Sequence, residues 1–162
     1  MNIHWNVAQR TDNTLTNYLK VCEQAATDNA AFRTFKSNPH YTPILEHADP
    51  GLGASHLRNI KSNNPHLLTD YPAMWENDNY GTPNAHDYEF QICSPTTLQY
   101  ISVLSNLINQ LGSLDNYVIA EIGGGYGGQA KIITDIFKVK QYDLIDLYEP
   151  SLLPVSYTHL TL

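Results

Sequence analysis

The chain of 162 residues carries nine Lys and Arg residues against sixteen Asp and Glu, a formal charge of −7. Its cations are scattered, whereas a surface that binds nucleic acid needs clustered cations to release counterions. No apolar run reaches the roughly 18 residues that span a bilayer, and Met1–Asn6 lack the charged and apolar regions of a signal peptide. We therefore expect a cytoplasmic protein with neither nucleic-acid nor membrane partners.

The two cysteines, Cys22 and Cys93, lie far apart in the sequence and outside any Cys-x-x-Cys or Cys/His spacing. Neither a structural zinc site nor a disulfide framework is indicated. We expect both thiols to be small buried apolar groups, and the sequence predicts no metal site.

The first ninety residues contain helical and irregular segments. Over 11–27 apolar residues recur at helical spacing, and a second helical piece is expected over 28–36. Short helices are expected over 43–47 and 54–61, separated by a turn at Asp49–Gly53, where proline and glycine alternate with other residues. From 63 to 92 the chain is rich in Asn, Pro, Tyr and Asp without clear periodicity, which is typical of either a lid over a ligand or a connector on the surface.

Clearer signals begin at Ser94, a favourable helix N-cap followed by Pro95, which is preferred at the first helical position. Apolar residues then recur on one face until Gly112, which predicts a helix over 95–111 that lies against a sheet. A buried strand is expected over 117–122 and a helix over 128–137. The next apolar run, 142–147, predicts a second strand parallel to the first.

A glycine-rich turn joins the first predicted strand to the helix that follows it. Glycines at 123, 125 and 127 let the backbone leave the strand sharply and approach a ligand closely, because no Cβ stands in the way. Asp146, about 20 residues downstream, is expected at the carboxyl end of the neighbouring strand, where it can accept hydrogen bonds from ribose hydroxyls. The two segments together predict a nucleotide-cofactor site.

Glu121 favours one cofactor over another. The pattern Gly123-x-Gly125-x-x-Gly128 also satisfies the dinucleotide fingerprint, so the glycines alone fit both NAD and S-adenosylmethionine. A carboxylate on a buried strand needs a cationic or donor partner, since burying it alone costs several kcal/mol. S-adenosylmethionine carries an ammonium and a sulfonium, whereas the pyrophosphate of NAD is anionic. The position of Glu121 therefore favours S-adenosylmethionine as the cofactor.

The motifs themselves resemble a known family. Glu121–Gln129 followed by Tyr142–Pro150 is similar to the sugar O-methyltransferases, whose motifs read E-I-G-G-G-Y-G-G and then I-D-L-P-E, although Tyr148 stands where the family favours proline. Ser94–Tyr100 and, more loosely, Asp78–Pro83 also match. The resemblance implies methyl transfer from S-adenosylmethionine to a sugar hydroxyl of a small molecule or glycan. The candidate cofactor-binding residues are Glu121, Gly123, Gly124, Gly125, Tyr126, Gly127 and Asp146.

The sequence thus predicts an α/β protein in which residues 1–93 form a helical and irregular N-terminal region on the cap or substrate side. Residues 94–154 are expected to begin a Rossmann-like domain with the first two parallel strands of its sheet. Residues 155–162 resemble the translated end of a transposon adapter used in preparing sequencing libraries, and we expect them to be a non-native tail. Because two parallel strands leave apolar faces uncovered, the chain is expected to be an inactive, aggregation-prone part of a longer enzyme.

No catalytic base is assigned from the sequence. His86 and Asp87 could supply a base with its orienting acid, although a solvent-exposed His86 is the competing interpretation. The rings of Tyr80 or Trp75 could stack on a sugar. Two other functions stay open, an NAD(P)-dependent oxidoreductase and a non-catalytic nucleotide-binding module. The sequence leaves the oligomeric state undetermined.

Overall fold

The computed structural model describes residues 13–160, and the side chains up to Pro154. The first part of the chain forms helices, most of them short. They are α1 (Thr14–Thr27), α2 (Asn29–Phe32), the 3₁₀ helix η1 (Phe35–Ser37), α3 (Thr42–Leu45), α4 (Pro50–Asn63) and the 3₁₀ helices η2 (Pro65–Leu68) and η3 (Pro72–Asn79). The predicted helix over 11–27 is confirmed from Thr14 onward, whereas the helical piece expected over 28–36 is divided by a turn into α2 and η1.

The second part of the chain alternates strands and helices. Its elements are β1 (His86–Asp87), β2 (Ile92–Cys93), α5 (Pro95–Leu111), β3 (Val118–Ile122), α6 (Gly128–Thr134), β4 (Gln141–Ile145) and α7 (Tyr148–Leu160). The strands β1 and β2 form a short antiparallel pair. The strands β3 and β4 pair in parallel, with Val118 opposite Gln141 and Ile122 opposite Ile145. The mixed α/β composition and the parallel pair are therefore confirmed. The expectation that the first strand is buried is wrong, since Val118 and Ile122 are 58% and 84% exposed.

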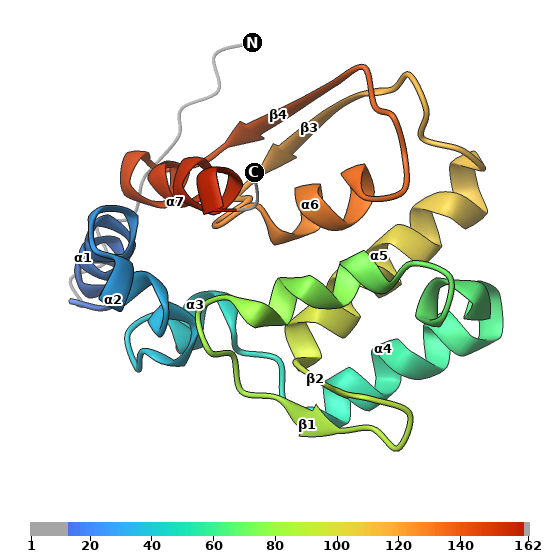
Figure 1. Ribbon diagram of the computed structural model, residues 1–162, viewed down its shortest axis with the longest axis horizontal. Coiled ribbons are helices and arrows are strands. Elements are labelled where there is room, and N and C mark those ends of the chain that lie inside the picture. The colour runs from blue at the N-terminus through green and yellow to red at the C-terminus, as the bar shows by residue number, and fades with distance from the viewer. Residues whose placement is uncertain (1–12, 161–162) are drawn as a thin grey trace, which may run out of the picture.

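The helix over 95–111 begins as predicted. The Ser94 hydroxyl accepts a hydrogen bond from the Thr97 amide at 3.0 Å, and Asp78 in turn accepts from both the Ser94 amide and its hydroxyl. The expectation that this helix lies directly against the sheet needs correction. It packs chiefly on α4 and next on α6, and α6 lies between it and the strands (Figure 1).

The predicted turn at Asp49–Gly53 is wrong. Asp49 is the N-cap of α4, where its side chain accepts a hydrogen bond from the Leu52 amide at 2.7 Å, and Pro50 occupies the first helical position. Proline there loses no hydrogen bond, since the first amides of a helix have no helical partner. The residues that predicted a break thus start the helix.

The segment 63–92 is more ordered than its composition predicted. Two 3₁₀ helices begin at Pro65 and Pro72, and they place Leu67 and Met74 in the core with no exposed surface. The segment therefore supplies core residues. An interpretation as an unstructured loop does not hold.

Two apolar clusters form the interior. One gathers residues of α4, η2, η3, α5 and α6, with Ile119 and Tyr142 of the parallel pair packed against it. The other joins α1, α2, η1 and Tyr41 to Tyr126 and Leu153, which come from the far end of the chain. Both clusters combine residues from either side of position 94, and the division into regions there remains a prediction.

The cysteines are buried, as expected. Cys22 belongs to the second cluster and Cys93 to the first, and neither forms a disulfide. Burial raises the pKa of each thiol to about 12. Both groups are therefore protonated and unreactive at neutral pH.

The predicted non-native tail begins inside a helix. α7 runs through Pro154 into the residues predicted to be foreign, and residues 161–162 lie outside the described chain.

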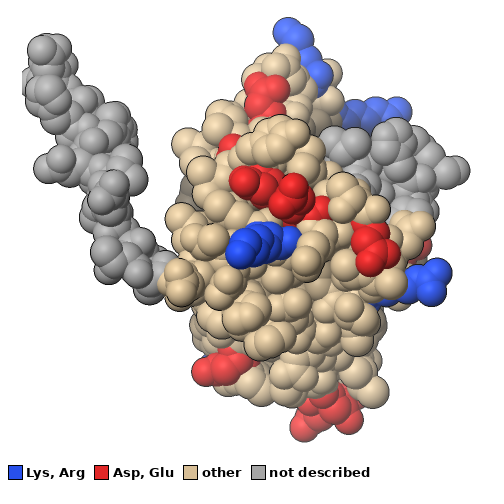
Figure 2. All heavy atoms as spheres, turned by 90° about the vertical axis from the view of Figure 1, so that its left-hand side faces the viewer, with Lys and Arg blue, Asp and Glu red and all other residues tan. Residues whose placement is uncertain are grey.

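Figure 2 shows the face that carries α1 and α7, where the lysine and arginine side chains, in blue, do not form one continuous patch. Within the described residues, no helix combines the length and apolar character needed to cross a membrane.

Candidate functional site

The glycine-rich turn lies where the carboxyl ends of β3 and β4 meet. The turn leaves β3 after Ile122 and enters α6 at Gly128. The Gly123 amide donates to the Ile145 carbonyl at 2.8 Å, and the Gly127 amide donates to the Gly124 carbonyl at 2.9 Å. The first bond continues the parallel ladder by one residue, and the second closes the turn before the helix begins.

Asp146 follows β4 directly and lies against this turn. Its Oδ2 accepts a hydrogen bond from the Gly125 amide at 2.7 Å, and its Oδ1 accepts one from the Leu147 amide at 2.7 Å. The structure thus brings together the glycine turn and the acid that the sequence paired with it. A carboxylate offers about four acceptor positions, so Asp146 retains capacity for further donors while it holds the turn.

Glu121 is half-buried on β3, and one donor among the described residues binds its carboxylate. The Tyr142 hydroxyl on β4 donates to Glu121 Oε2 at 2.9 Å. Burial raises the pKa of Glu121, the Tyr142 hydrogen bond opposes this, and the negative charge of Asp146 raises the pKa further. Among the described residues, no lysine, arginine or histidine pairs with Glu121. Within the part of the chain that the structure describes, the site therefore holds two neighbouring carboxylates and no compensating cation.

Two glycines of the turn differ in their surroundings. Gly123 has φ +76°, and a Cβ placed on it would meet no atom within 4 Å. Gly125 has φ +54°, and a Cβ there would come 2.5 Å from Leu45 Cδ1 on α3. The close approach that the sequence predicted at Gly125 is filled by Leu45, a protein side chain. The open side of the turn is at Gly123.

This difference gives a first prediction. Gly125→Ala should destabilise the fold by about 1 kcal/mol for the left-handed backbone, and by a further 1–3 kcal/mol for overpacking against Leu45. Gly127→Ala is the matched control, since Gly127 has a left-handed backbone with φ +84° and ψ 19°, and a Cβ there meets its nearest atom at an ordinary contact distance of 3.4 Å. Urea unfolding monitored by circular dichroism compares the two variants. Equal losses would show that the contact between Gly125 and Leu45 is absent.

The remaining candidate residues of the turn are packed inside the protein. Gly124 and Gly127 are packed by Leu144, and Gly127 also by Pro154 of α7. Tyr126 is wholly buried, with its ring 5.7 Å from that of Phe35 between centroids. The side chain of Tyr126 therefore has the surroundings of a core residue, and its contact with a cofactor remains a prediction.

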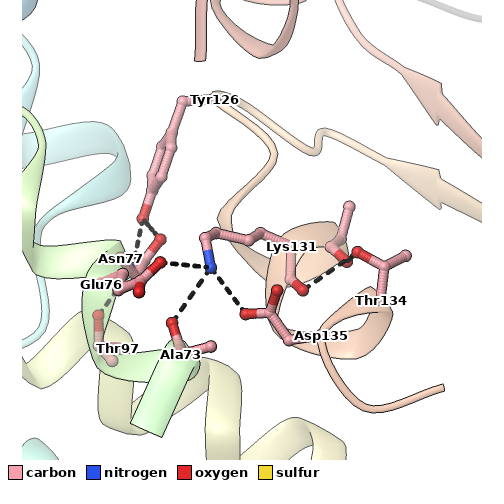
Figure 3. Close-up of polar contacts among 9 residues, drawn as sticks. Ala73, Glu76, Asn77, Thr97, Tyr126, Lys131, Thr134 and Asp135 are labelled. Carbon is pink, nitrogen blue, oxygen red and sulfur yellow. Dashed lines mark hydrogen bonds and ion pairs between the residues drawn. The ribbon is translucent and has the colours of Figure 1, made fainter. Parts of the chain in front are cut away.

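Tyr126 is held by two residues that the sequence did not reveal. Its hydroxyl and the Asn77 side-chain amide exchange hydrogen bonds of 2.9 and 3.1 Å (Figure 3). Lys36 Nζ lies 4.1 Å from the centre of the Tyr126 ring and donates to the Asn77 carbonyl at 2.7 Å. Desolvation lowers the pKa of Lys36 to about 8. Neither Lys36 nor Asn77 belongs to a motif or an apolar period, so no sequence signal could have found them.

A second contact fixes the helix that leaves the turn. Lys131 of α6 donates to the Ala73 carbonyl of η3 at 3.1 Å and to Asp135 Oδ2 at 2.7 Å, and it lies 3.8 Å from Glu76 Oε2 (Figure 3). These contacts tie α6 to η3, in the segment that composition alone described as irregular. Lys131 thus holds the start of α6, directly after the glycine turn, against η3.

The other residues considered from the sequence have different surroundings. His86 and Asp87 form β1, on the opposite side of α5 from β3 and α6 (Figure 1), and Asp87 accepts a hydrogen bond from the Glu89 amide. Trp75 packs edge-on against Phe90, and Tyr80 packs edge-on against Phe32. The structure does not bring His86-Asp87 to the glycine turn.

No group of three or more His, Cys, Asp or Glu side chains within the described residues is placed to hold a metal ion. Comparisons of the chain with protein-family models, with curated proteins and with solved structures found no match. The geometry of the site therefore carries the functional argument.

Proposed function

We propose that the chain forms the S-adenosylmethionine-binding edge of a Rossmann-like O-methyltransferase. The observation that carries the proposal is Glu121, a half-buried carboxylate with no cationic partner among the described residues, two positions ahead of an open glycine turn. A positively charged ligand at Gly123 would supply the missing charge. The two carboxylates make this edge of the strands attractive to a cation and repellent to an anion.

The residues fit this cofactor on the open side of the turn. Gly123 allows the ligand to approach the backbone, Glu121 lies within reach of a cationic methionine end, and Asp146 keeps acceptor positions for ribose hydroxyls. S-adenosylmethionine, when bound, supplies the methyl group. The chain's contribution is to hold the cofactor. Gly125 takes no part in this contact, because Leu45 already packs against it.

The acceptor, a sugar hydroxyl, rests on the resemblance of Glu121–Gln129 and Tyr142–Pro150 to sugar O-methyltransferases. Alignment of the acceptor oxygen with the methyl group converts a bimolecular step into a unimolecular one, which removes up to roughly 7–11 kcal/mol of barrier in the best cases. A weakly acidic hydroxyl also needs a base beside it. None of the described side chains at the turn is assigned that role.

The dinucleotide alternative keeps one supporting observation. Gly128 lies so close to Tyr126 and Tyr100 that only glycine fits, as the third glycine of the dinucleotide fingerprint requires. Two features oppose it. The Gly125 amide, which a pyrophosphate would need, already donates to Asp146, and the nearby charges are negative.

Binding experiments on the 162-residue chain test the choice of cofactor. Calorimetric titration with S-adenosylhomocysteine and with NAD, on protein whose folding is verified by circular dichroism, should give heat for the first ligand only. Binding of NAD without S-adenosylhomocysteine would reverse the assignment. A folded chain that binds neither ligand would refute it.

Two variants locate the site. Glu121→Gln should weaken binding of S-adenosylhomocysteine about tenfold to a hundredfold, since a hydrogen bond to a charged group contributes about 1.5–3 kcal/mol. Gly123→Ala should abolish binding, because its methyl group enters the open space. Glu89→Gln and Gly112→Ala are the controls: the first makes the same change at an exposed position, and the second places an alanine at another glycine of positive φ, outside the turn. Equal losses in variant and control would remove the site from the turn.

A further inference from the structure

A pocket lies on the N-terminal side of the protein, between α2 and the residues at and after the end of η3. Its volume is about 490 Å³, within the range of small-molecule sites. Six side chains that differ in chemistry line it: Asn29, Phe32, Arg33, Asn79, Tyr80 and Thr82. None of them belongs to the glycine turn, so this pocket is separate from the proposed cofactor site.

Hydrogen bonds between two segments fix the pocket's wall. The Thr82 hydroxyl donates to the Arg33 carbonyl at 2.7 Å, and the Lys36 amide donates to the Gly81 carbonyl at 2.9 Å. Thr82 has φ +50°, which is rare for a β-branched residue and persists only where the surroundings impose it. The wall is therefore preformed, and it stores backbone strain at the pocket.

The aromatic part of the lining offers an apolar surface. Phe32 is buried, and the half-buried Tyr80 ring meets it edge-on with centroids 6.2 Å apart. Such a pair presents an apolar wall against which the flat face of a ligand ring packs. The amides of Asn29 and Asn79 lie in the same lining and are exposed, so they are available to hydroxyl or carboxyl groups at the rim.

Arg33 adds a positive charge to this lining. Its side chain is exposed, and among the described residues it has no ion-pair partner and no side-chain hydrogen bond. A guanidinium presents a planar set of donors that matches a carboxylate with two parallel hydrogen bonds. In a chain of formal charge −7, an unpaired arginine beside two aromatic rings distinguishes this pocket from the surrounding surface.

We propose that this pocket binds a six-membered ring that carries a carboxylate. The ring packs on Tyr80 and Phe32, the carboxylate pairs with Arg33, and the two asparagines bind polar groups at the rim. A uronic acid and an aromatic carboxylate share this chemistry. Binding here does not depend on the proposed function, because no residue of the glycine turn takes part.

Titrations followed by nuclear magnetic resonance on the folded 162-residue chain test the proposal with three probes, glucuronate, benzoate and glucose. The expected result is that at least one acid shifts the backbone amides of 29–33 and 79–82 and binds at least tenfold more tightly than glucose. Response to glucuronate alone identifies a saccharide ring, and response to benzoate alone an aromatic one. The proposal would be overturned if neither acid shifted these amides, or if glucose bound as tightly as the acids.

Variants separate the charge from the ring. Arg33→Gln should weaken binding of the acid at least tenfold, and Arg58→Gln, a change of another exposed arginine on α4, should leave it unaltered. Tyr80→Ala should also weaken binding, with Tyr117→Ala as its control. Equal effects of the two arginine variants would contradict the role of Arg33. Unaltered binding of S-adenosylhomocysteine by Arg33→Gln would confirm that the two sites are independent.

Discussion

Tyr126→Ala is expected to cost about 3–5 kcal/mol of the free energy of unfolding, the range for removing a buried aromatic side chain. The ring has no exposed surface and contacts Phe35 and Tyr100 at centroid distances of 5.7 and 6.3 Å. Its removal leaves a cavity behind the glycine turn, takes a partner from Asn77 and uncovers the Lys36 ammonium from an aromatic face. Since small domains have total stabilities of about 5–15 kcal/mol, this change should remove a large fraction of the stability of the chain.

Tyr126→Phe separates the ring from its hydroxyl. This variant keeps the ring and loses the hydrogen bonds of the hydroxyl, among them those with Asn77, whose amide still donates to the Thr97 hydroxyl at 2.7 Å. We expect a loss of about 1–2 kcal/mol. Urea unfolding followed by far-ultraviolet circular dichroism measures both variants. A loss for Tyr126→Ala no larger than that for Tyr126→Phe would mean that the ring is not packed as described.

The stability of the chain is expected to fall by about 3 kcal/mol between pH 4.5 and 7 through Glu46 alone, at about 1.4 kcal/mol for each pKa unit. Glu46 is 8% exposed, and burial raises its pKa from 4.5 to about 7 against the opposing effects of Lys36 and Thr96. In this interval the folded chain keeps a proton that the unfolded chain has lost, so a rise in pH favours unfolding. Above pH 7 the full cost is present.

Lys36 has the opposite effect on stability at higher pH. Its pKa is lowered from 10.5 to about 8, so between these values the unfolded chain holds the extra proton and stability rises with pH. We therefore expect the decline to end near pH 7–8, measured by urea unfolding across pH 4.5–9. Above that range the raised pKa values of Cys22 and Cys93 favour unfolding, because their thiols ionise first in the unfolded chain.

Glu46→Gln should reduce the decline between pH 4.5 and 7, and Glu89→Gln should not change it. Part of the decline should survive, since burial also raises the pKa of Glu121. Constant stability of the unmodified chain over this interval would show that Glu46 is not buried.

The predictions that were confirmed share a local origin. The helix after Ser94 announces itself through a cap, a proline and an apolar face, all within 17 residues. The parallel strands and the glycine turn are likewise encoded in short runs, and Asp146 is placed by the length of one βαβ unit. Such features depend on neighbours in sequence, and a single chain contains all the information they need.

The features that escaped prediction depend on contacts across long sequence separations. Lys36, Asn77 and Tyr126 meet from three distant segments, and Leu45 reaches Gly125 from a fourth. A lysine or an asparagine in an irregular stretch normally indicates exposure, and here the tertiary structure buries both. The Asp49-Pro50 pair misled for a different reason, since the same residues serve either a turn or the first turn of a helix.

The contact between α1 and α7 influences how the chain is made as well as how it is held. Tyr18 and Cys22 are buried in a cluster that includes Phe32 and Leu153, so α1 can pack on α2 at once but meets α7 only after most of the polypeptide has been synthesised. At about 5–20 residues per second, translation of the residues between α1 and α7 takes roughly 6–24 s. During that time the part of α1 that α7 covers is available to chaperones at the ribosome exit.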